Sequence, residues 1–114
     1  LAHGKIAAII MQRDFEIEDP DIINAVSYHT TGRPGMSLLE KIIYIADAVE
    51  PNRSYPDVDE IRQMAKGSLF DTLCECLGRT MILTIREGSV VHPDTLTTWN
   101  AMKMRAKAQK EKVK

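Results

Sequence analysis

The sequence predicts an all-α protein, and three observations carry this prediction. Apolar residues recur at the three- and four-residue spacing of helices in about six segments. Aromatic residues make up only 5% of the 114 residues, whereas isoleucine, leucine, methionine and alanine are plentiful, and this mixture favours packed helices over a β-sandwich. The pair Val90-Val91 is too short a run to predict a strand.

The first two helices and the loop after them are marked by local signals. Residues 3–11 are predicted as the first helix, because isoleucines recur there at helical spacing. Asp19-Pro20 begins the second, as a capping Asp followed by Pro at the first helical position, and this helix is expected to end near Tyr28. Residues 30–36 are predicted as a loop, since two glycines and a proline oppose helix continuation.

The third helix raises a question about burial. Ser37 is expected to be its N-cap, with Glu40 as the other half of a capping box, and the helix runs to about Val49. Its apolar arc is wide enough to predict a largely buried helix. A polar strip of Glu40, Tyr44 and Asp47 lies opposite that arc. The strip either lines a wet, cation-holding cleft or faces solvent, and the helical wheel alone favours solvent.

Three further helices complete the prediction. A short helix is expected over residues 57–65. A longer one starts at Ser68, could bend at Gly78 and stops at Gly88. The last starts at residues 92–94, where His92 helps to cap it.

Charge separates the chain into two parts. Residues 1–102 are predicted to form part of one helical domain, and residues 103–114 a basic tail that is a helix end or disordered. The last fourteen residues carry a net charge of +5 and the first hundred a net charge of −6. Such a tail could touch nucleic acid, but a solvated helix end explains it more economically, so nucleic acid is not an expected partner.

The remaining composition points to the cytoplasm. No apolar run approaches the roughly 18 residues that a membrane span needs, and no signal-peptide pattern opens the chain. Cys74 and Cys76 point to different sides of a helix, so we expect free buried thiols rather than a disulfide. The start at Leu1, already inside a predicted helix, suggests a piece of a longer polypeptide.

His3, His29 and Asp47 are the candidate metal ligands, on three different predicted helices. Imidazole and carboxylate groups suit divalent iron, manganese or zinc. Spacing alone is weak evidence for such a site, because a lone His at a helix end is more often a cap or a surface residue.

Candidate phosphate-binding residues lie around the same region. Arg33 stands in the Gly/Pro loop before a helix start, an arrangement that can hold a phosphate. Arg53 and Lys41 are weaker candidates for the outer phosphates of a polyphosphate. Thr30 and Thr31 could donate hydrogen bonds to phosphate oxygens, or could only cap the loop.

One run of sequence resembles a known family. It is YHTTGRPGMSLLEKIIYIADAVEPNR, residues 28–53, and it is accompanied by LAHG at the start, EDPDIINAV before Tyr28 and VHPDTLTTWN near the end. Together these resemble the C-terminal part of the YqeK-type HD-domain phosphohydrolases over nearly the whole chain. The resemblance implies an HD-type helical bundle that hydrolyses symmetrical dinucleoside tetraphosphates to two nucleoside diphosphates. It also implies a bacterial cytoplasmic enzyme with two divalent metal ions, usually iron.

The resemblance also assigns residues. His3 matches one family ligand in its Leu-x-His-Gly setting, His29 the next in Tyr-His-Thr-Thr-Gly, and Asp47 the final catalytic Asp in Ile-Ala-Asp. The family's first His and its His-Asp dyad would lie upstream of Leu1, so the domain is expected to be truncated at its N-terminus. We therefore expect this piece alone to bind metal poorly and to be nearly inactive.

Two other functions remain open on the sequence. One is an HD phosphohydrolase acting on another nucleotide, such as a deoxynucleoside triphosphate. The other is a metal-free helical interaction module. Apolar surface exposed by the absence of upstream helices could also promote a homodimer or domain swapping.

Overall fold

A computed structural model describes residues 3–52, 54 and 57–113. It contains six helices and, within those residues, no strand, which confirms the predicted fold class. The helices are α1 (His3–Asp14), α2 (Pro20–Ser27), α3 (Leu38–Val49), α4 (Val58–Met64), α5 (Leu69–Arg86) and α6 (Pro93–Val113). The first helix is one turn longer than predicted, and the last continues through the basic tail. The helix α5 is continuous through Gly78, so the bend considered there does not divide it.

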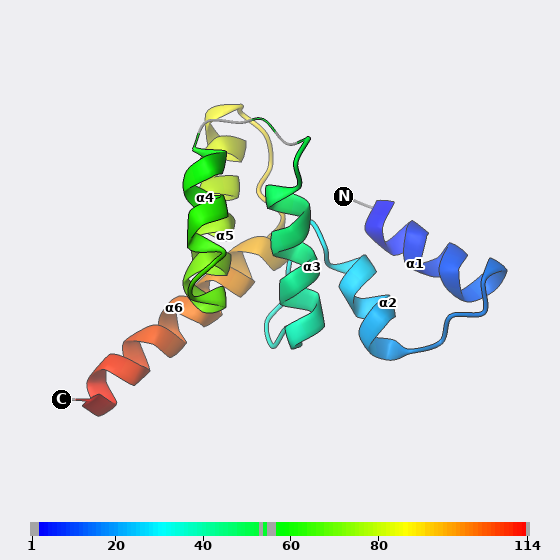
Figure 1. Cartoon of the computed structure of the whole chain (residues 1–114), viewed down its shortest axis with the longest axis horizontal. Coiled ribbons are helices and arrows are strands. Elements are labelled where there is room, and N and C mark those ends of the chain that lie inside the picture. The colour runs from blue at the N-terminus through cyan, green and yellow to red at the C-terminus, as the bar shows by residue number, and fades with distance from the viewer. Residues whose placement is uncertain (1–2, 53, 55–56, 114) are drawn as a thin grey trace.

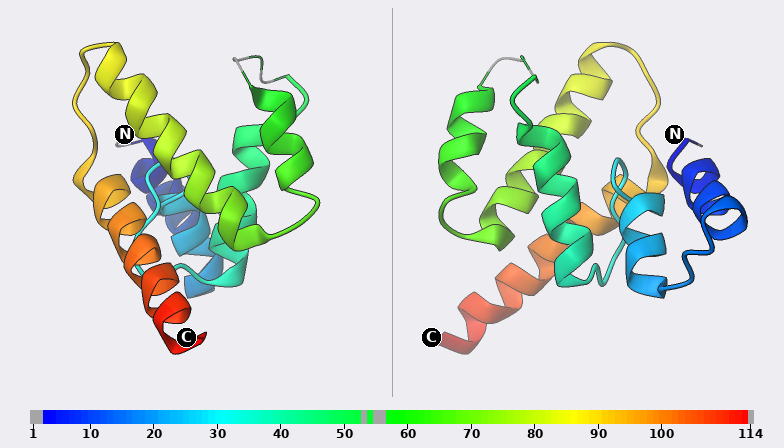
Figure 2. Two further views of the ribbon diagram at one scale, coloured as in Figure 1. Left: turned by 90° about the vertical axis from the view of Figure 1, so that its left-hand side faces the viewer. Right: turned by 45° about the vertical axis from the view of Figure 1, so that its right-hand side comes forward.

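The helices are arranged around α3, as Figures 1 and 2 show. On one side α3 packs against α2, and α2 in turn packs against α1 at the edge of the molecule. On the other side it packs against α4 and α5, and α6 packs against α5. The last turns of α6 extend away from this body (Figure 1), so its earlier turns are the ones that contribute to the packed domain.

The core lies where α3, α4 and α5 meet. Ile61, Leu73 and Leu77 are completely buried there, and Tyr44 and Ile45 of α3 pack against them. Cys74 and Cys76 are both buried and free, as predicted. Burial of these side chains is the main source of stability for a domain of this size.

The orientation of α3 corrects the helical-wheel expectation. Glu40 and Tyr44 are buried, at 1% and 4% exposure, whereas Leu38 and Ile42 are 64% and 45% exposed. The polar strip thus faces the interior, and part of the apolar arc faces outward. The wheel failed because it counts polar groups as outward-facing, although Glu40 has a buried partner and the Tyr44 ring supplies apolar contact area.

The loop before α3 depends on two glycines with left-handed backbone geometry. Gly32 and Gly35 have φ of 74° and 73°, a region that other residues adopt only with strain. Gly32 is also buried, and a Cβ there would lie 3.3 Å from a methyl carbon of Thr98 on α6. The loop is therefore held tightly between α2, α3 and the start of α6.

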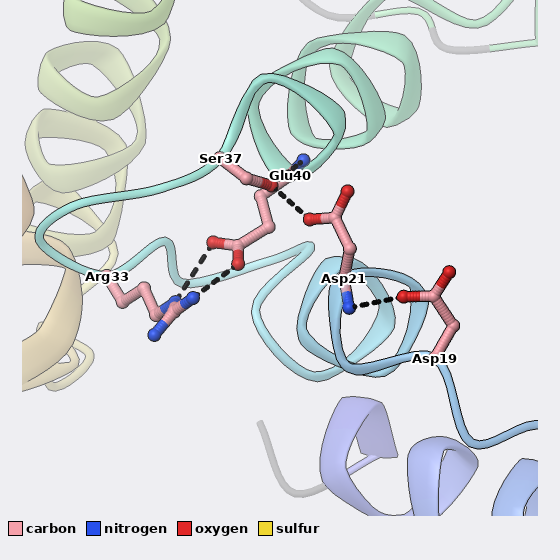
Figure 3. A network of polar contacts seen from close by, with 5 residues as sticks. All are labelled: Asp19, Asp21, Arg33, Ser37 and Glu40. Carbon is pink, nitrogen blue, oxygen red and sulfur yellow. Dashed lines mark hydrogen bonds and ion pairs between the residues drawn. The ribbon is translucent and has the colours of Figure 1, made fainter.

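The first turn of α3 confirms one half of the expected capping box and corrects the other. The Ser37 hydroxyl accepts a hydrogen bond of 3.2 Å from the Glu40 backbone N–H, and donates one to the Asp21 carboxylate on α2. The Glu40 side chain does not return to the backbone of Ser37; it reaches across the loop to Arg33 (Figure 3). A bidentate ion pair with Arg33 is stronger than the single hydrogen bond that the carboxylate could accept from the Ser37 backbone N–H, and this decides the rotamer.

Replacing Ser37 tests this cap. We expect Ser37→Ala to lower the free energy of unfolding by about 1 kcal/mol, because the Glu40 N–H loses its acceptor. Chemical denaturation followed by circular dichroism measures the change. Ser37→Thr keeps an acceptor at the same place and should lose clearly less; an equal loss in both variants would show that the cap contributes nothing.

Candidate functional site

A cavity of about 340 Å³ opens between the end of α2, one face of α3, and the helices α4 and α5. His29, Thr30 and Asp47 line it, together with Arg79 of α5. Two of the three predicted metal ligands thus meet in one hollow, although 18 positions separate them in the chain. His29 lies in the turn after α2 rather than on the helix itself.

The ring of His29 has a defined orientation. Its Nδ1 lies 2.6 Å from the carbonyl oxygen of Val26, and because a carbonyl can only accept, Nδ1 carries the proton. The lone pair of the neutral ring is then on Nε2. Metal-binding histidines generally show this arrangement, in which one ring nitrogen donates to a backbone carbonyl and the other binds the metal.

The start of α1 lies against His29. Gly4 is buried, and a Cβ built on it would lie 3.0 Å from the Val26 carbonyl oxygen and 3.4 Å from His29 Nδ1. Only a residue without a side chain allows this approach. The side chain of His3 lies outside the described residues, but the close contact of Gly4 brings the backbone that carries it beside His29.

The residues predicted to bind phosphate lie in different parts of the structure. Thr30 lines the cavity with His29 and Asp47. Arg33 and Lys41 line a second, smaller hollow of about 100 Å³ between the loop, α3 and α6. Thr31 is buried; its hydroxyl donates to the Gly32 carbonyl and its own carbonyl accepts from Thr95 on α6. Arg53 lies outside the described residues.

Arg33 is held from two sides. Its Nε and Nη2 donate to the two carboxylate oxygens of Glu40 at 3.0 and 2.5 Å (Figure 3). The centre of its guanidinium lies 5.2 Å from the ring centroid of Tyr28, a cation–π distance. The hydrogen bonds to Glu40 raise the pKa of Arg33 above its ordinary value. Within the structure, therefore, Arg33 first serves to neutralise a buried carboxylate.

Comparison with known proteins identifies sequences that are similar to this chain. No family model matches it. It is 45% identical over 100 residues to a symmetrical bis(5'-nucleosyl)-tetraphosphatase of Bacillus subtilis, covering 88% of this chain and 54% of that protein. It is 40% identical over 107 residues to a protein of the same name from Halalkalibacterium halodurans, covering 94% of this chain and 57% of that protein.

A solved structure agrees with these relatives. It is described as a predicted HD superfamily hydrolase involved in NAD metabolism, from Clostridium acetobutylicum. It superposes with a TM-score of 0.89 at 42% identity, over 92% of this chain and 56% of the other. The chain belongs to the YqeK-type HD-domain family. It spans about half the length of the curated relatives it matches.

The HD hydrolase family generally uses divalent metals, and two residues that line the cavity carry groups able to bind one. Asp47 and the Nε2 of His29 are an oxygen and a nitrogen donor on its wall, a set suited to iron, manganese or zinc. Among the described residues, no group of three or more metal-binding side chains is found. The donors present fit a metal site that needs further ligands.

Sequence reasoning on this HD-domain chain missed Arg79. Its guanidinium contacts three carboxylates, with Nε 2.8 Å from Glu75, Nη2 3.0 Å from Glu60 and Nη1 3.4 Å from Asp57. These contacts tie α5 to the start of α4 beside the cavity. The i, i+4 spacing of Glu75 and Arg79 was the available signal, but that spacing alone cannot distinguish a surface pair from a cavity wall.

Cys76 is a titratable residue in the lining of this cavity. Burial raises the pKa of its thiol from 9.0 to about 11. Between these pH values the unfolded chain loses a proton that the folded protein retains. The contribution of Cys76 to stability is thus complete below pH 9 and is lost as pH rises towards 11. We expect the free energy of unfolding of the unmodified protein to fall more steeply across this range than that of Cys76→Ala. Denaturant titrations at several pH values measure both; parallel curves would contradict the raised pKa.

Proposed function

We propose that the intact protein hydrolyses symmetrical dinucleoside tetraphosphates, such as diadenosine tetraphosphate, to two nucleoside diphosphates. The observation that carries the proposal is the meeting of His29 and Asp47 in one cavity, in a chain 40–45% identical to proteins named for this activity. Because the chain spans about half of those relatives, the proposal concerns the whole gene product rather than this stretch alone.

The cavity's residues have distinct roles in this proposal. Asp47 and His29 Nε2 would hold a divalent metal, which when bound supplies Lewis-acid activation of water and of a phosphoryl oxygen. The hydrogen bond to Val26 keeps the proton on Nδ1, so the lone pair of the neutral ring lies on Nε2, the nitrogen that would bind the metal. The Thr30 hydroxyl, which belongs to the same lining, would donate to a phosphate oxygen.

Part of the cavity lining is apolar. Ala48, Ile61 and Leu83 line it with the ring of Tyr44. Such a surface excludes water and suits the flat face of a nucleobase better than a phosphate. A ligand that carries both a base and phosphates would therefore match the two kinds of wall.

We further propose two metal ions, with iron as the natural metal, in the full-length gene product. His3, at the start of α1 beside His29, would be a third ligand from this chain. Divided between two metal ions, three side chains would leave each ion with fewer than the three or four protein ligands that metal sites generally have. The 114-residue chain by itself is therefore proposed to retain little metal and to turn over little substrate.

The experiment is a substrate panel on the purified full-length gene product. Diadenosine tetraphosphate, ATP and a deoxynucleoside triphosphate are incubated with the metal-loaded protein, and products are separated by ion-exchange chromatography. ADP as the sole product from the tetraphosphate supports the proposal. Turnover of the triphosphate alone would favour an HD phosphohydrolase for another nucleotide. No metal by elemental analysis and no turnover would favour a helical interaction module.

The location and assembly of the protein are also proposals. No helix within the described ranges is long and apolar enough to cross a membrane. We propose a cytoplasmic enzyme. The outward isoleucines Ile6 and Ile9 of α1, with Leu38 and Ile42 of α3, would favour a homodimer of the 114-residue chain, which sedimentation analysis tests directly.

A further inference from the structure

The second hollow combines positive charge with an apolar floor. Arg33 of the loop, Lys41 of α3 and Arg105 of α6 line it, and none of its lining residues carries a carboxylate. Leu73 and Met36 form part of its floor, and both are buried. Arg33 and Lys41 lie on either side of the start of α3, whereas Arg105 lies far along the chain on α6, and only the fold brings it to the same hollow.

Of the three positive charges that line this hollow, only that of Arg33 is paired with a carboxylate among the described residues. Glu40 neutralises Arg33 by occupying its Nε and Nη2. Among the described residues, Lys41 and Arg105 have no ion pair and no hydrogen bond from their side chains. Two positively charged side chains without a carboxylate partner therefore line one small hollow, and a bound anion would offset their mutual repulsion.

The geometry also limits the size of a ligand. The volume of about 100 Å³ suits one phosphate group, whereas the cavity lined by His29 and Asp47 has about 340 Å³. The two hollows share no lining residue. The apolar floor lowers the local dielectric and so strengthens attraction between the cations and an anion above it.

We propose that this second hollow is an anion site that binds a single phosphate group through Lys41, Arg105 and the remaining Nη1 of Arg33. A bound phosphate would join α6 to α3 and to the loop that follows His29. The site lies outside the proposed catalytic cavity, and its ligand is defined by the phosphate group, whether free or at the end of a nucleotide.

The test is calorimetric titration of the protein with inorganic phosphate in metal-free buffer at fixed ionic strength, where no metal can bind the phosphate. The variant is Lys41→Gln with Arg105→Gln. Arg33 is left unchanged, because its removal would also strand Glu40. The matched control is Lys107→Gln with Lys110→Gln, which removes the same charge from exposed positions of α6 that do not line the hollow.

We expect saturable binding that the Lys41/Arg105 variant weakens at least about tenfold and the control weakens less than about twofold. A nucleoside 5′-monophosphate forms the second arm. Equal affinity would identify the phosphate group alone as the ligand, and tighter binding would identify a nucleotide. Absence of saturable binding, equal weakening in both variants, or unchanged affinity in the Lys41/Arg105 variant would each overturn the proposal.

Discussion

Replacing Asp47 by Asn should remove almost all tetraphosphate hydrolysis from the full-length gene product. The carboxylate lies on the cavity wall with His29, and an amide keeps the shape but is a far poorer metal ligand. Loss of supporting groups around a metal typically costs 10–100-fold, so loss of a ligand should cost about 100-fold or more. Initial rates of ADP release, measured with metal content on the same sample, report both effects.

The control for this substitution is Asp14→Asn at the exposed end of α1, which changes the same charge outside the cavity. It should leave the rate and the metal content unchanged. If Asp47→Asn hydrolysed the tetraphosphate at the rate of the unmodified protein, Asp47 would have no place in the site. A normal metal content with a lost rate would instead assign Asp47 to substrate handling.

The second large effect concerns stability. Arg33→Met should lower the free energy of unfolding by about 2–3 kcal/mol, because it leaves the Glu40 carboxylate, 1% exposed, without its bidentate partner. The figure is below the full cost of breaking a buried pair, since the Arg33 side chain is itself 34% exposed. Denaturant unfolding followed by circular dichroism gives the value.

Two comparisons isolate the cause of this loss. Arg13→Met removes a guanidinium whose pairing with Asp14 is exposed to water, and no measurable change is expected. Adding Glu40→Leu to Arg33→Met removes the stranded charge and should restore much of the stability. If the double variant were as unstable as the single one, the ion pair would not be the reason that Arg33 matters.

The helices themselves could be predicted because their signals are local. Asp19-Pro20, Ser37 and Ser68 begin three helices where expected, each with a side-chain oxygen accepting from the first turn. The His92 ring caps the last helix, accepting from the Asp94 N–H at 3.0 Å. These interactions join residues two or three positions apart, so the local sequence is enough to predict them.

Only some residues of the candidate site could be predicted from the sequence. The residues His29, Thr30 and Asp47 were singled out and share a cavity. Arg33 and Lys41 were singled out for the same site but line another hollow. Arg79 was not singled out at all, although it contacts carboxylates on two helices beside the cavity. The positions of these side chains depend on how the helices and the loop before α3 pack against one another, and spacing along one helix does not specify that.

By itself the sequence determined the helical class, the helix starts, the glycine-dependent loop and the candidate ligands, because caps, turns and periodicity act over a few residues. Only the tertiary structure decided that α3 turns Glu40 and Tyr44 inward and leaves Leu38 and Ile42 outside. The physical reason is that the burial of a carboxylate depends on its partner. Arg33 lies seven residues before Glu40, across the loop, and only folding brings its guanidinium to that carboxylate.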